Sequence, residues 1–475
     1  MRRIQIFIVC LILLAYTHLY YFTFSGVYRD TDAMLDCKNL IVKAAASTIE
    51  IGVVPSQDSK IAKLLPHNTT EGDVTSENRN KTNYGQKKSF PRKPKLMFLK
   101  THKSATSTLV NMLYLYGIRR KLNFVMKPYD HWLGEISQTI RVSELLQPRP
   151  GGCWEIQVTH GIFSAEGEHE VLPKNQTFYT TIIRSPATQV PSAFYYFGQE
   201  KRQRLKYGKK FSKSELIDKY LERANITPTD FLSPAIDLGW KRWSANMGYD
   251  MPVEDKINGF IEHMKEEMDL VMISERIDES LIVLKEYMEW KLDDILYLNR
   301  NIAPSLSKTN LTKSTIRNIY NHLTLDKQMF DFFNASLDRH IEKLGRKHIN
   351  EEVIKFRKMR HEFENRCFDK TKVKVMEWDT RSYELTKYGK SENLACTFLQ
   401  LNDVQLDDAI SQLQNSRDYT MPIRYKGSLV TKNYIFYDLI TTLQREFENR
   451  TVSYWDPQQD TIEEKAISLN VPRLW

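Results

Sequence analysis

The chain has 475 residues, of which 41% are hydrophobic, and this is ample for a large folded core. These figures exclude a small binding module. The formal net charge is +9 and it is uneven, since the span from Asn78 to Tyr129 contains thirteen Lys and Arg residues but no Asp or Glu. Such a run predicts an anionic ligand, although a charge run taken alone favours a solvated face or an unstructured tether.

The N-terminus predicts a membrane anchor. Arg2 and Arg3 precede an uncharged, mostly apolar run at residues 4–24, which is long enough to cross a bilayer as a helix. A cleaved signal peptide is the alternative, but the run is long, is rich in Tyr and Phe at its far end and has no clear small-x-small cleavage site. We therefore expect a cytoplasmic tail at residues 1–3, a retained signal-anchor at 4–24 and a luminal remainder, as in a single-pass type II membrane protein.

Sequons and cysteines agree with an oxidising lumen. Cys10 lies in the apolar run, which leaves four cysteines, Cys37, Cys153, Cys367 and Cys396, and among these we favour a Cys367–Cys396 pair. The sequence has no C-x-x-C pattern or His/Cys cluster with zinc spacing, so we expect no metal. Seven Asn-x-Ser/Thr sequons lie at Asn68, Asn80, Asn175, Asn225, Asn310, Asn334 and Asn449.

The hydrophobic pattern divides the luminal part into a stem at residues 25–94 and a folded domain at 95–475. Strands alternate with helices, which predicts an α/β fold with a mainly parallel sheet, helices on both of its faces and helical additions at the C-terminus. The predicted strands are at residues 96–99, 123–126, 154–159, 178–183 and 270–273. The predicted helices are at 107–116, where Gly117 ends the helix, at 212–224 with a Ser212/Glu215 capping box, and at 278–290, 325–366, 407–413 and 434–447.

Residues 98–110, FLKTHKSATSTLV, are typical of a phosphate-binding loop. A short apolar strand runs into a polar loop and then into an apolar helix, whose N-terminal N–H groups and dipole favour an anion. Lys100, His102 and Lys103 add positive charge. A nucleotide-triphosphate P-loop is the rival interpretation, but it requires G-x-x-x-x-G-K-[ST], and this loop contains no glycine. The loop therefore predicts binding of a 5′-phosphate through backbone N–H groups and hydroxyls, without a metal.

A second motif lies at residues 180–197, TTIIRSPATQVPSAFYYF. A strand there ends in Arg184 and leads through Pro186 into a helix that carries Ser192. Between the two motifs, His160 follows the strand predicted at 154–159. A histidine at a strand end is more often structural than catalytic, but the flanking phosphate motifs favour a role as general base.

Together the two motifs resemble those of the galactose 3-O-sulfotransferase family, whose founding activity is on galactosylceramide. In sulfotransferases such a loop binds the 5′-phosphosulfate of the donor, 3′-phosphoadenylyl sulfate (PAPS). A strand-end Arg and a Ser eight positions later bind its 3′-phosphate, and Arg184 and Ser192 have that spacing. Residues 270–290 also resemble this family, so the resemblance covers roughly residues 95–344 and implies a P-loop-like sulfotransferase fold in the Golgi lumen.

The resemblance also implies roles for individual residues. Lys103 matches the family's loop lysine and would stabilise charge on the leaving phosphate, while His160 would remove the proton of the acceptor hydroxyl. His102 and His131 are the other candidates for this base. The residues implied to bind PAPS are Lys100, His102, Lys103, Ser104, Ala105, Thr106, Ser107, Thr108, Arg184 and Ser192.

The expected activity is transfer of a sulfuryl group from PAPS to a sugar hydroxyl, the 3-hydroxyl of galactose on a glycolipid or glycoprotein glycan. No nucleic-acid partner is expected. Residues 245–250 read ANMGYD, where the family more usually has an Arg-Asn pair followed by Asp-Leu-Gly, so the acceptor stays open. Two other functions are a luminal kinase or nucleotide hydrolase that uses the same loop, and a catalytically inactive, membrane-anchored glycan-binding protein.

Three further features have two interpretations each. Tyr195, Tyr196 and Phe197 have the spacing of core or wall residues rather than of an adenine stack. The basic cluster at 201–213 flanks the donor or an acidic glycan, or else forms a mobile surface loop. Glu275 contacts an acceptor sugar, or it caps a helix or forms a salt bridge.

Overall fold

The computed structural model describes residues 93–401, except 129–131, 135–138, 149–151, 209, 224–232, 249, 299–310, 376–380 and 393, and also positions 406, 407, 410, 411, 414, 424, 425, 428 and 429. Nearly all of these belong to one compact unit, residues 92–149 and 154–475. The tail expected at 1–3, the signal-anchor at 4–24, nearly all of the stem and the helix at 434–447 lie outside the described residues. Within the described part, no helix is both long and apolar enough to span a membrane.

Four parallel strands form the central sheet, in the order β2-β1-β3-β4. Leu99 at the end of β1 is opposite Thr181 of β3, and Thr181 is in turn opposite Val271 of β4. All four strands are buried, as parallel strands covered by helices must be. The mainly parallel α/β sheet is therefore confirmed. The strands are β1 (Lys95–Leu99), β2 (Ile156–Gln157), β3 (Thr177–Ile183) and β4 (Leu270–Ile273).

The chain leaves β1 and β3 in opposite directions across the sheet. β1 connects through α3 (Thr106–Arg119) to β2 on one side, whereas β3 connects to β4 on the other. Because crossovers between parallel strands are right-handed, these two connections cover opposite faces. The carboxyl ends of β1 and β3 are thus the topological switch point, where α/β sheets bind their ligands.

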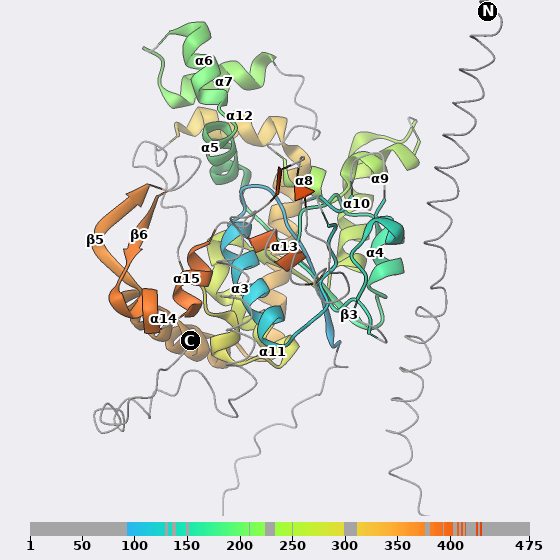
Figure 1. Ribbon diagram of the computed structural model, residues 1–475. Helices are drawn as coiled ribbons and strands as arrows, with labels where there is room; N and C mark the ends of the chain where they lie inside the picture. Colours follow the sequence, from blue (N-terminus) through green and yellow to red (C-terminus); the bar gives the residue numbers. More distant parts are fainter. Residues whose placement is uncertain are drawn as a thin grey trace, which may run out of the picture. The chain divides into compact units, whose positions relative to one another are not determined.

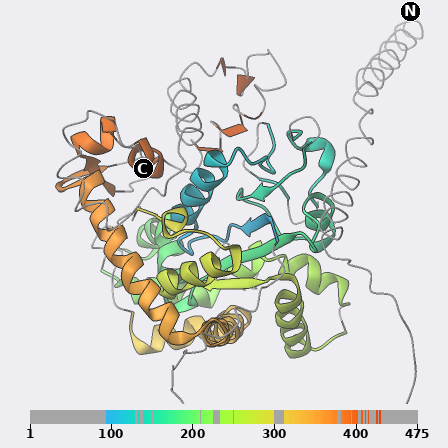
Figure 2. The ribbon, with the colours of Figure 1, turned by 90° about the horizontal axis from the view of Figure 1, so that it is seen from below.

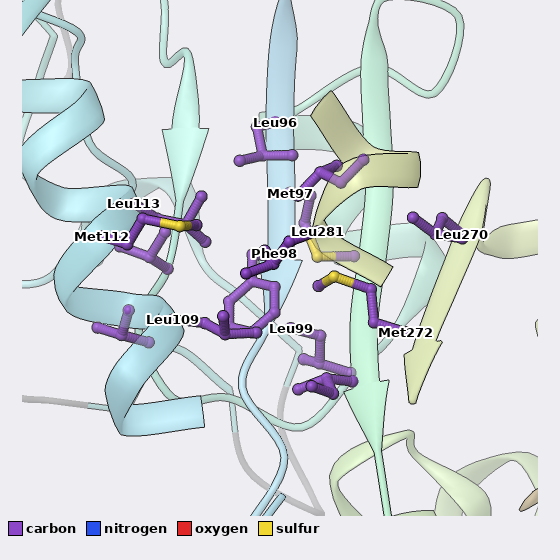
Figure 3. Close-up of a cluster of buried hydrophobic side chains, with 14 of the residues drawn as sticks. Leu96, Met97, Phe98, Leu99, Leu109, Met112, Leu113, Leu270, Met272 and Leu281 are labelled. Atoms are coloured by element: carbon purple, nitrogen blue, oxygen red, sulfur yellow. The ribbon is translucent and has the colours of Figure 1, made fainter. Parts of the chain in front are cut away.

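Apolar side chains from helices and strands build the core around this switch point. Figure 3 shows Leu109, Met112 and Leu113 of α3 directed toward β1, and Leu281 of α11 (Ile277–Met288) beside Met97 and Phe98 of β1. These side chains are at most 2% exposed. Since burial of one such side chain contributes roughly 1.5–3 kcal/mol, this packing fixes the loop that joins β1 to α3.

Two glycines do not act as the sequence suggested. Gly117 does not end the first helix, because α3 continues to Arg119; a Cβ at Gly117 would lie only 2.5 Å from Phe124, so this glycine allows close packing instead. The helix expected at 325–366 is two helices, α13 (Thr324–Leu344) and α14 (Arg346–Cys367), because Gly345 separates them with φ +98°. The predicted strand at 123–126 contributes, among its described neighbours, one bridge between Phe124 and Ile156.

Four helices form a group with an apolar cluster of their own (Figure 1). They are α5 (Pro186–Tyr196), α6 (Gln199–Tyr207), α7 (Lys213–Arg223) and α12 (Lys313–His322). Fully buried Val190, Phe194 and Leu216 belong to this cluster. The predicted capping box is confirmed, since the backbone N–H of Ser212 donates to Glu215 and the N–H of Glu215 donates to the Ser212 hydroxyl. The basic cluster at 201–213 is therefore largely helical, in α6 and the start of α7, rather than a loop.

The C-terminal part is not only helical. Figure 2 shows α14 as the long orange helix that leads to an antiparallel hairpin of β5 (Phe368–Val375) and β6 (Arg381–Leu385). The predicted disulfide between Cys367 and Cys396 is confirmed, with a Cα–Cα distance of 5.4 Å. The other described elements are α4 (Ala165–Val171), α8 (Pro234–Asp237), α9 (Trp240–Asn246), α10 (Val253–Glu267), α15 (Leu394–Gln400), β7 (Arg424–Tyr425) and β8 (Ser428–Leu429).

Candidate active site

The loop between β1 and α3 turns through two left-handed residues. Lys103 has φ +57°, and Ala105, at the N-cap of α3, has φ +66°. A left-handed backbone costs a residue other than glycine about 1–3 kcal/mol, and such strain is concentrated at ligand-binding sites. The loop thus turns tightly into the helix without using glycine. A helix N-terminus entered in this way presents its backbone N–H groups to an anion.

Three hydroxyl groups hold this loop in place. The Thr101 hydroxyl donates to the carbonyl oxygen of Ile182 on β3. The Thr106 hydroxyl donates to the Thr101 carbonyl oxygen at 2.9 Å, and the Ser104 hydroxyl donates to the His102 carbonyl oxygen at 3.3 Å. Because these hydroxyls bond within the protein, their role in the loop is structural.

Arg184 connects the two sequence motifs. Its Nη1 donates to the carbonyl oxygen of Lys103 at 3.3 Å, and its Nε donates to the Thr188 hydroxyl at 3.0 Å. Burial lowers the pKa of the Arg184 guanidinium, and the nearby carboxylate of Glu275 partly offsets this effect. A desolvated cation at a switch point is suited to an anionic ligand. Glu275 accepts hydrogen bonds from the N–H of Ser185 and the Thr188 hydroxyl, so it caps α5.

One carboxylate holds His102 at two points. Asp237, at the end of α8, accepts the backbone N–H of His102 at 2.7 Å and lies 2.8 Å from its Nδ1. Asp237 is only 2% exposed. In turn, α8 is held by the buried Asp326 of α13, which accepts the Ser233 hydroxyl and the N–H of Ala235. Burial raises the pKa of Asp326 to about 6, and the neighbouring charge of Asp237 adds to this rise.

His160 lies against His102 in a cluster of stacked rings. The two imidazole centroids are 4.8 Å apart, and the Trp132 ring stacks on His160 at 5.0 Å and on His102 at 5.5 Å. The His160 carbonyl oxygen accepts the N–H of Leu133, which fixes the backbone after β2. The fold therefore brings the predicted base next to the phosphate loop. His131, the other candidate, lies outside the described residues.

The second motif approaches Lys103 through α5. The ammonium of Lys103 lies 3.7 Å from the centroid of the Tyr196 ring, a cation–π contact, and Tyr196 is 47% exposed. Of the two positions that its helical spacing suggested, core or wall, the exposure of Tyr196 excludes the core. Ser192 is half-buried on the same helix. Gln189, also on α5, donates to the His102 carbonyl oxygen at 3.3 Å, while its own buried Oε1 has no hydrogen-bond partner among the described residues.

The remaining predicted contacts lie at both ends of the loop. Lys100 follows β1 directly and is only 4% exposed, so it is buried at the start of the loop. Ser107 and Thr108 are half-buried in the first turn of α3. The structure therefore brings Lys103, Ala105 and Arg184 to one edge of the sheet, with His102 and His160 beside them.

Asp237 and Trp132 were not singled out from the sequence, and Tyr196 was considered only as a core or wall residue. The sequence does contain one signal for Asp237. The tripeptide Asp-Leu-Gly, which the resembled family usually has and which is missing from residues 245–250, occurs at residues 237–239. Gly239 has φ +83°, and a Cβ there would lie 2.3 Å from the carbonyl oxygen of Phe163, so this turn requires glycine. No local pattern marks Trp132 or Tyr196, since their contacts arise only from the folded chain.

The arrangement combines an anion cradle with a group that can accept a proton. The N-terminus of α3, Lys103 and Arg184 supply positive potential at the ends of β1 and β3. The His102 and His160 rings stack on each other and on Trp132, and His102 is next to Lys103 in the chain. Among the described residues, no group of three His, Cys, Asp or Glu side chains has the arrangement of a metal site.

Comparisons with known proteins agree with this chemistry. A family model described as galactose-3-O-sulfotransferase matches residues 8–433. The chain is 29% identical over 285 residues to mouse galactosylceramide sulfotransferase and 30% identical over 290 residues to the human protein, and each match covers 58% of this chain and 64% of the relative. It is 26% identical over 298 residues to human galactose-3-O-sulfotransferase 2, which covers 60% of this chain and 70% of that protein. The chain thus matches somewhat less than two thirds of the length of the galactosylceramide sulfotransferases.

Proposed function

Because the chain belongs to the galactose-3-O-sulfotransferase family, we propose that it transfers a sulfuryl group from PAPS to the 3-hydroxyl of galactose on a glycolipid or glycoprotein glycan. One observation carries this proposal: the guanidinium of Arg184 lies 3.3 Å from the carbonyl oxygen of Lys103. The two phosphate motifs, far apart in sequence, thus meet at one edge of the sheet. A ligand with two separate phosphate groups, such as PAPS, requires both motifs at the same site.

The residues present fit such a donor. The strained turn at Lys103 and Ala105 opens α3 toward an anion, and Arg184 offers a partly desolvated guanidinium to a second one. The buried Oε1 of Gln189 lies on the same helix as Ser192, between Arg184 and Ser192 in sequence, the two residues expected to bind the 3′-phosphate. PAPS would supply the activated sulfuryl group, and the chain would bind it in the P-loop-like sulfotransferase fold that the family resemblance implies.

Two residues carry the proposed chemistry. The Lys103 ammonium neutralises the charge that grows on the leaving phosphate, and its contact with Tyr196 holds it in position. His160 accepts the proton of the galactose hydroxyl as the new S–O bond forms. Asp237 accepts a hydrogen bond from Nδ1 of His102. The His102 ring packs against His160 and orients it. Fixed groups of this kind stabilise the transition state more than the ground state.

We also place the protein in the Golgi membrane, as a single-pass type II protein with its folded domain in the lumen. The charged residues Arg2 and Arg3 and the apolar run at 4–24 support this orientation. The acceptor would then be a membrane glycolipid or a glycoprotein glycan that passes through the same lumen.

A transfer assay tests the proposed activity. The full chain in detergent is incubated with labelled PAPS and a panel of galactose-terminated glycolipids and glycans. We expect transfer to galactose, a loss of about 10²–10³-fold in Lys103→Ala and of 10²–10⁴-fold in His160→Ala, and full activity in Lys358→Ala, an exposed lysine on α14. Full activity of Lys103→Ala would show that the loop chemistry is wrong.

The same assay separates the two other functions. A luminal kinase or nucleotide hydrolase needs Mg²⁺, so sulfate transfer that disappears in EDTA counts against our proposal. A catalytically inactive glycan-binding protein would transfer no label to any acceptor and would not bind adenosine 3′,5′-bisphosphate.

A further inference from the structure

The basic helix α6 is not used by the proposed reaction. Its sequence, QEKRQRLKY, contains Lys201, Arg202, Arg204 and Lys206 but only one acidic residue, Glu200. None of its residues is buried, and Leu205 is 79% exposed. A short helix with this composition gains little from packing, so its cations and its exposed leucine need another explanation.

A cavity of about 480 Å³ lies between α6 and the end of α5. Its lining consists of Tyr195 from α5 and Glu200, Lys201, Arg204 and Leu205 from α6. The wall therefore combines an aromatic ring and an exposed aliphatic side chain with two cations. Small-molecule sites have this character, mostly apolar with a few convergent polar groups.

Arg204 is preorganised in this cavity. Its Nε and Nη2 donate to Oε1 of Glu200 at 3.0 and 2.7 Å, and its Nη1 donates to the carbonyl oxygen of Phe211 at 3.0 Å. Lys213, which is 3% exposed, lies 4.0 Å from the other oxygen of Glu200. One carboxylate is thus shared by two cations, and Lys201 adds a third, so the net charge around the cavity is positive.

Crowding of these cations favours an added anion. Burial lowers the pKa of Lys213; Glu200 opposes this effect, and the charge of Arg204 reinforces it. An anion in the cavity would offset the repulsion between Arg204 and Lys213. A fixed guanidinium also binds carboxylate and sulfate groups with two parallel hydrogen bonds at a small entropic cost.

The cavity is next to the candidate active site in the chain and in space. Tyr195, which lines it, is followed directly by Tyr196, whose ring lies 3.7 Å from the ammonium of Lys103. A saccharide bound to the active site through its terminal galactose would reach this cavity with its inner residues. Tyr195 and Leu205 in the lining of the cavity suit the carbon face of a sugar ring.

We propose that this cavity, lined by Tyr195, Lys201, Arg204 and Leu205, binds an acidic sugar residue of the acceptor glycan. This rests on the proposed function and adds a substrate class to it: galactose-terminated glycans that carry a carboxylate or sulfate group on an inner residue. Lys201 and Arg204 bind the acidic group, while Tyr195 and Leu205 contact the ring that carries it.

Steady-state kinetics of the full chain in detergent test this inference. The acceptors are a galactose-terminated trisaccharide with one glucuronic acid residue, the same trisaccharide with a 6-sulfated hexose in that place, and the neutral trisaccharide. We expect KM for at least one acidic acceptor to be about tenfold below that of the neutral one, because a charged hydrogen bond contributes about 1.5 kcal/mol. Of the two acidic acceptors, the one with the lower KM shows whether the cavity prefers a carboxylate or a sulfate group.

Matched variants locate the effect. Lys201→Ala and Lys201→Glu should abolish the preference for the acidic acceptor while KM for PAPS and for the neutral acceptor stays unchanged. Lys206→Ala removes an exposed lysine of the same helix that does not line the cavity, and it should keep the preference. Equal KM values for acidic and neutral acceptors in the wild-type protein would overturn the inference. So would a higher KM for PAPS in Lys201→Glu, since the cavity would then belong to the donor.

Direct binding separates this inference from the proposed function. The glucuronic acid trisaccharide is titrated into the full chain by calorimetry in the presence of adenosine 3′,5′-bisphosphate, with Lys201→Glu as the control. Binding that requires Lys201 supports the inference even if no acceptor is sulfated, which would be a failure of the proposed function alone. If Lys201→Glu instead reduces co-sedimentation with phosphatidylserine vesicles and leaves the trisaccharide affinity unchanged, α6 is a membrane contact and the inference is wrong.

Discussion

His102 is bound twice by Asp237, through its backbone N–H at 2.7 Å and its Nδ1 at 2.8 Å. Since a carboxylate only accepts hydrogen bonds, Nδ1 of His102 is the donor in this contact. One side chain therefore fixes both the course of the phosphate loop and the orientation of a ring that packs on His160. Asp237 is thus a positioning residue of the candidate active site.

The first prediction concerns this contact. Asp237→Asn keeps the size of the side chain, but it removes the negative charge and replaces one of the two oxygens that contact His102 with an NH₂ group, which cannot accept a hydrogen bond. We expect kcat to fall about 100-fold, because small displacements of a catalytic group cost that much. Kinetics with labelled PAPS measure it, with Asp250→Asn as a control at an exposed position. Unchanged kcat in a folded Asp237→Asn protein would remove Asp237 from the mechanism.

The second prediction concerns the guanidinium that joins the two motifs. Arg184→Lys keeps the charge but cannot donate to Lys103 and Thr188 and also face a phosphate. We expect KM for PAPS to rise about 10–100-fold, because charged hydrogen bonds contribute about 1.5–3 kcal/mol, with a smaller change in kcat. Arg317→Lys, at an exposed position on α12, serves as the matched control. A change confined to kcat would instead place Arg184 at the reacting atoms.

The third prediction separates stability from donor binding at Ala105. This residue has φ +66°, a conformation that costs alanine about 1–2 kcal/mol, whereas glycine loses only about 0.5–1 kcal/mol in entropy. Ala105→Gly should therefore raise the free energy of unfolding slightly, by about 0.5–1 kcal/mol. Donor affinity should fall, because the loop is less restricted. Urea denaturation and titration with adenosine 3′,5′-bisphosphate measure the two effects, and a loss of stability would show that the left-handed turn is not strained.

Local patterns predicted the elements that carry the site. The strands β1, β3 and β4 are short apolar runs bounded by polar residues, and the capping box of Ser212 and Glu215 depends on neighbours three positions apart. Compartment and number predicted disulfides among four cysteines, and the Cys367–Cys396 pair that we favoured among them is confirmed. The same patterns misplaced the ends of helices at Gly117 and Gly345, where the deciding contacts or angles belong to the folded backbone.

The contacts within the site could not be predicted in this way. Asp237 meets His102 across 135 positions of sequence, and only the packing of α8 on α13 brings them together. Tyr196 has the periodicity of a buried helix face, yet it lies beside Lys103 because α5 starts at the switch point. Strand order and crossover direction determine such contacts, and neither can be read from a local motif.

The last prediction concerns pH. Glu168 of α4 is fully buried, accepts a hydrogen bond from Gln157 at 3.1 Å, and burial raises its pKa from 4.5 to about 7. The folded protein therefore binds this proton more tightly than the unfolded chain. The resulting contribution, about 3 kcal/mol, is full below pH 4.5 and is lost as the pH rises to about 7. The raised pKa of Asp326 acts in the same direction.

Stability should thus decrease from acidic to neutral pH. Glu168→Gln keeps the shape of the side chain but cannot ionise, so we expect it to flatten this dependence. It should be more stable than the wild-type protein at pH 8, by up to about 3 kcal/mol, and similar to it at pH 5. Urea denaturation of both proteins between pH 4.5 and 8 measures this, with Glu351→Gln as the exposed control. Parallel curves for wild type and Glu168→Gln would mean that Glu168 ionises in the folded protein as easily as in the unfolded chain.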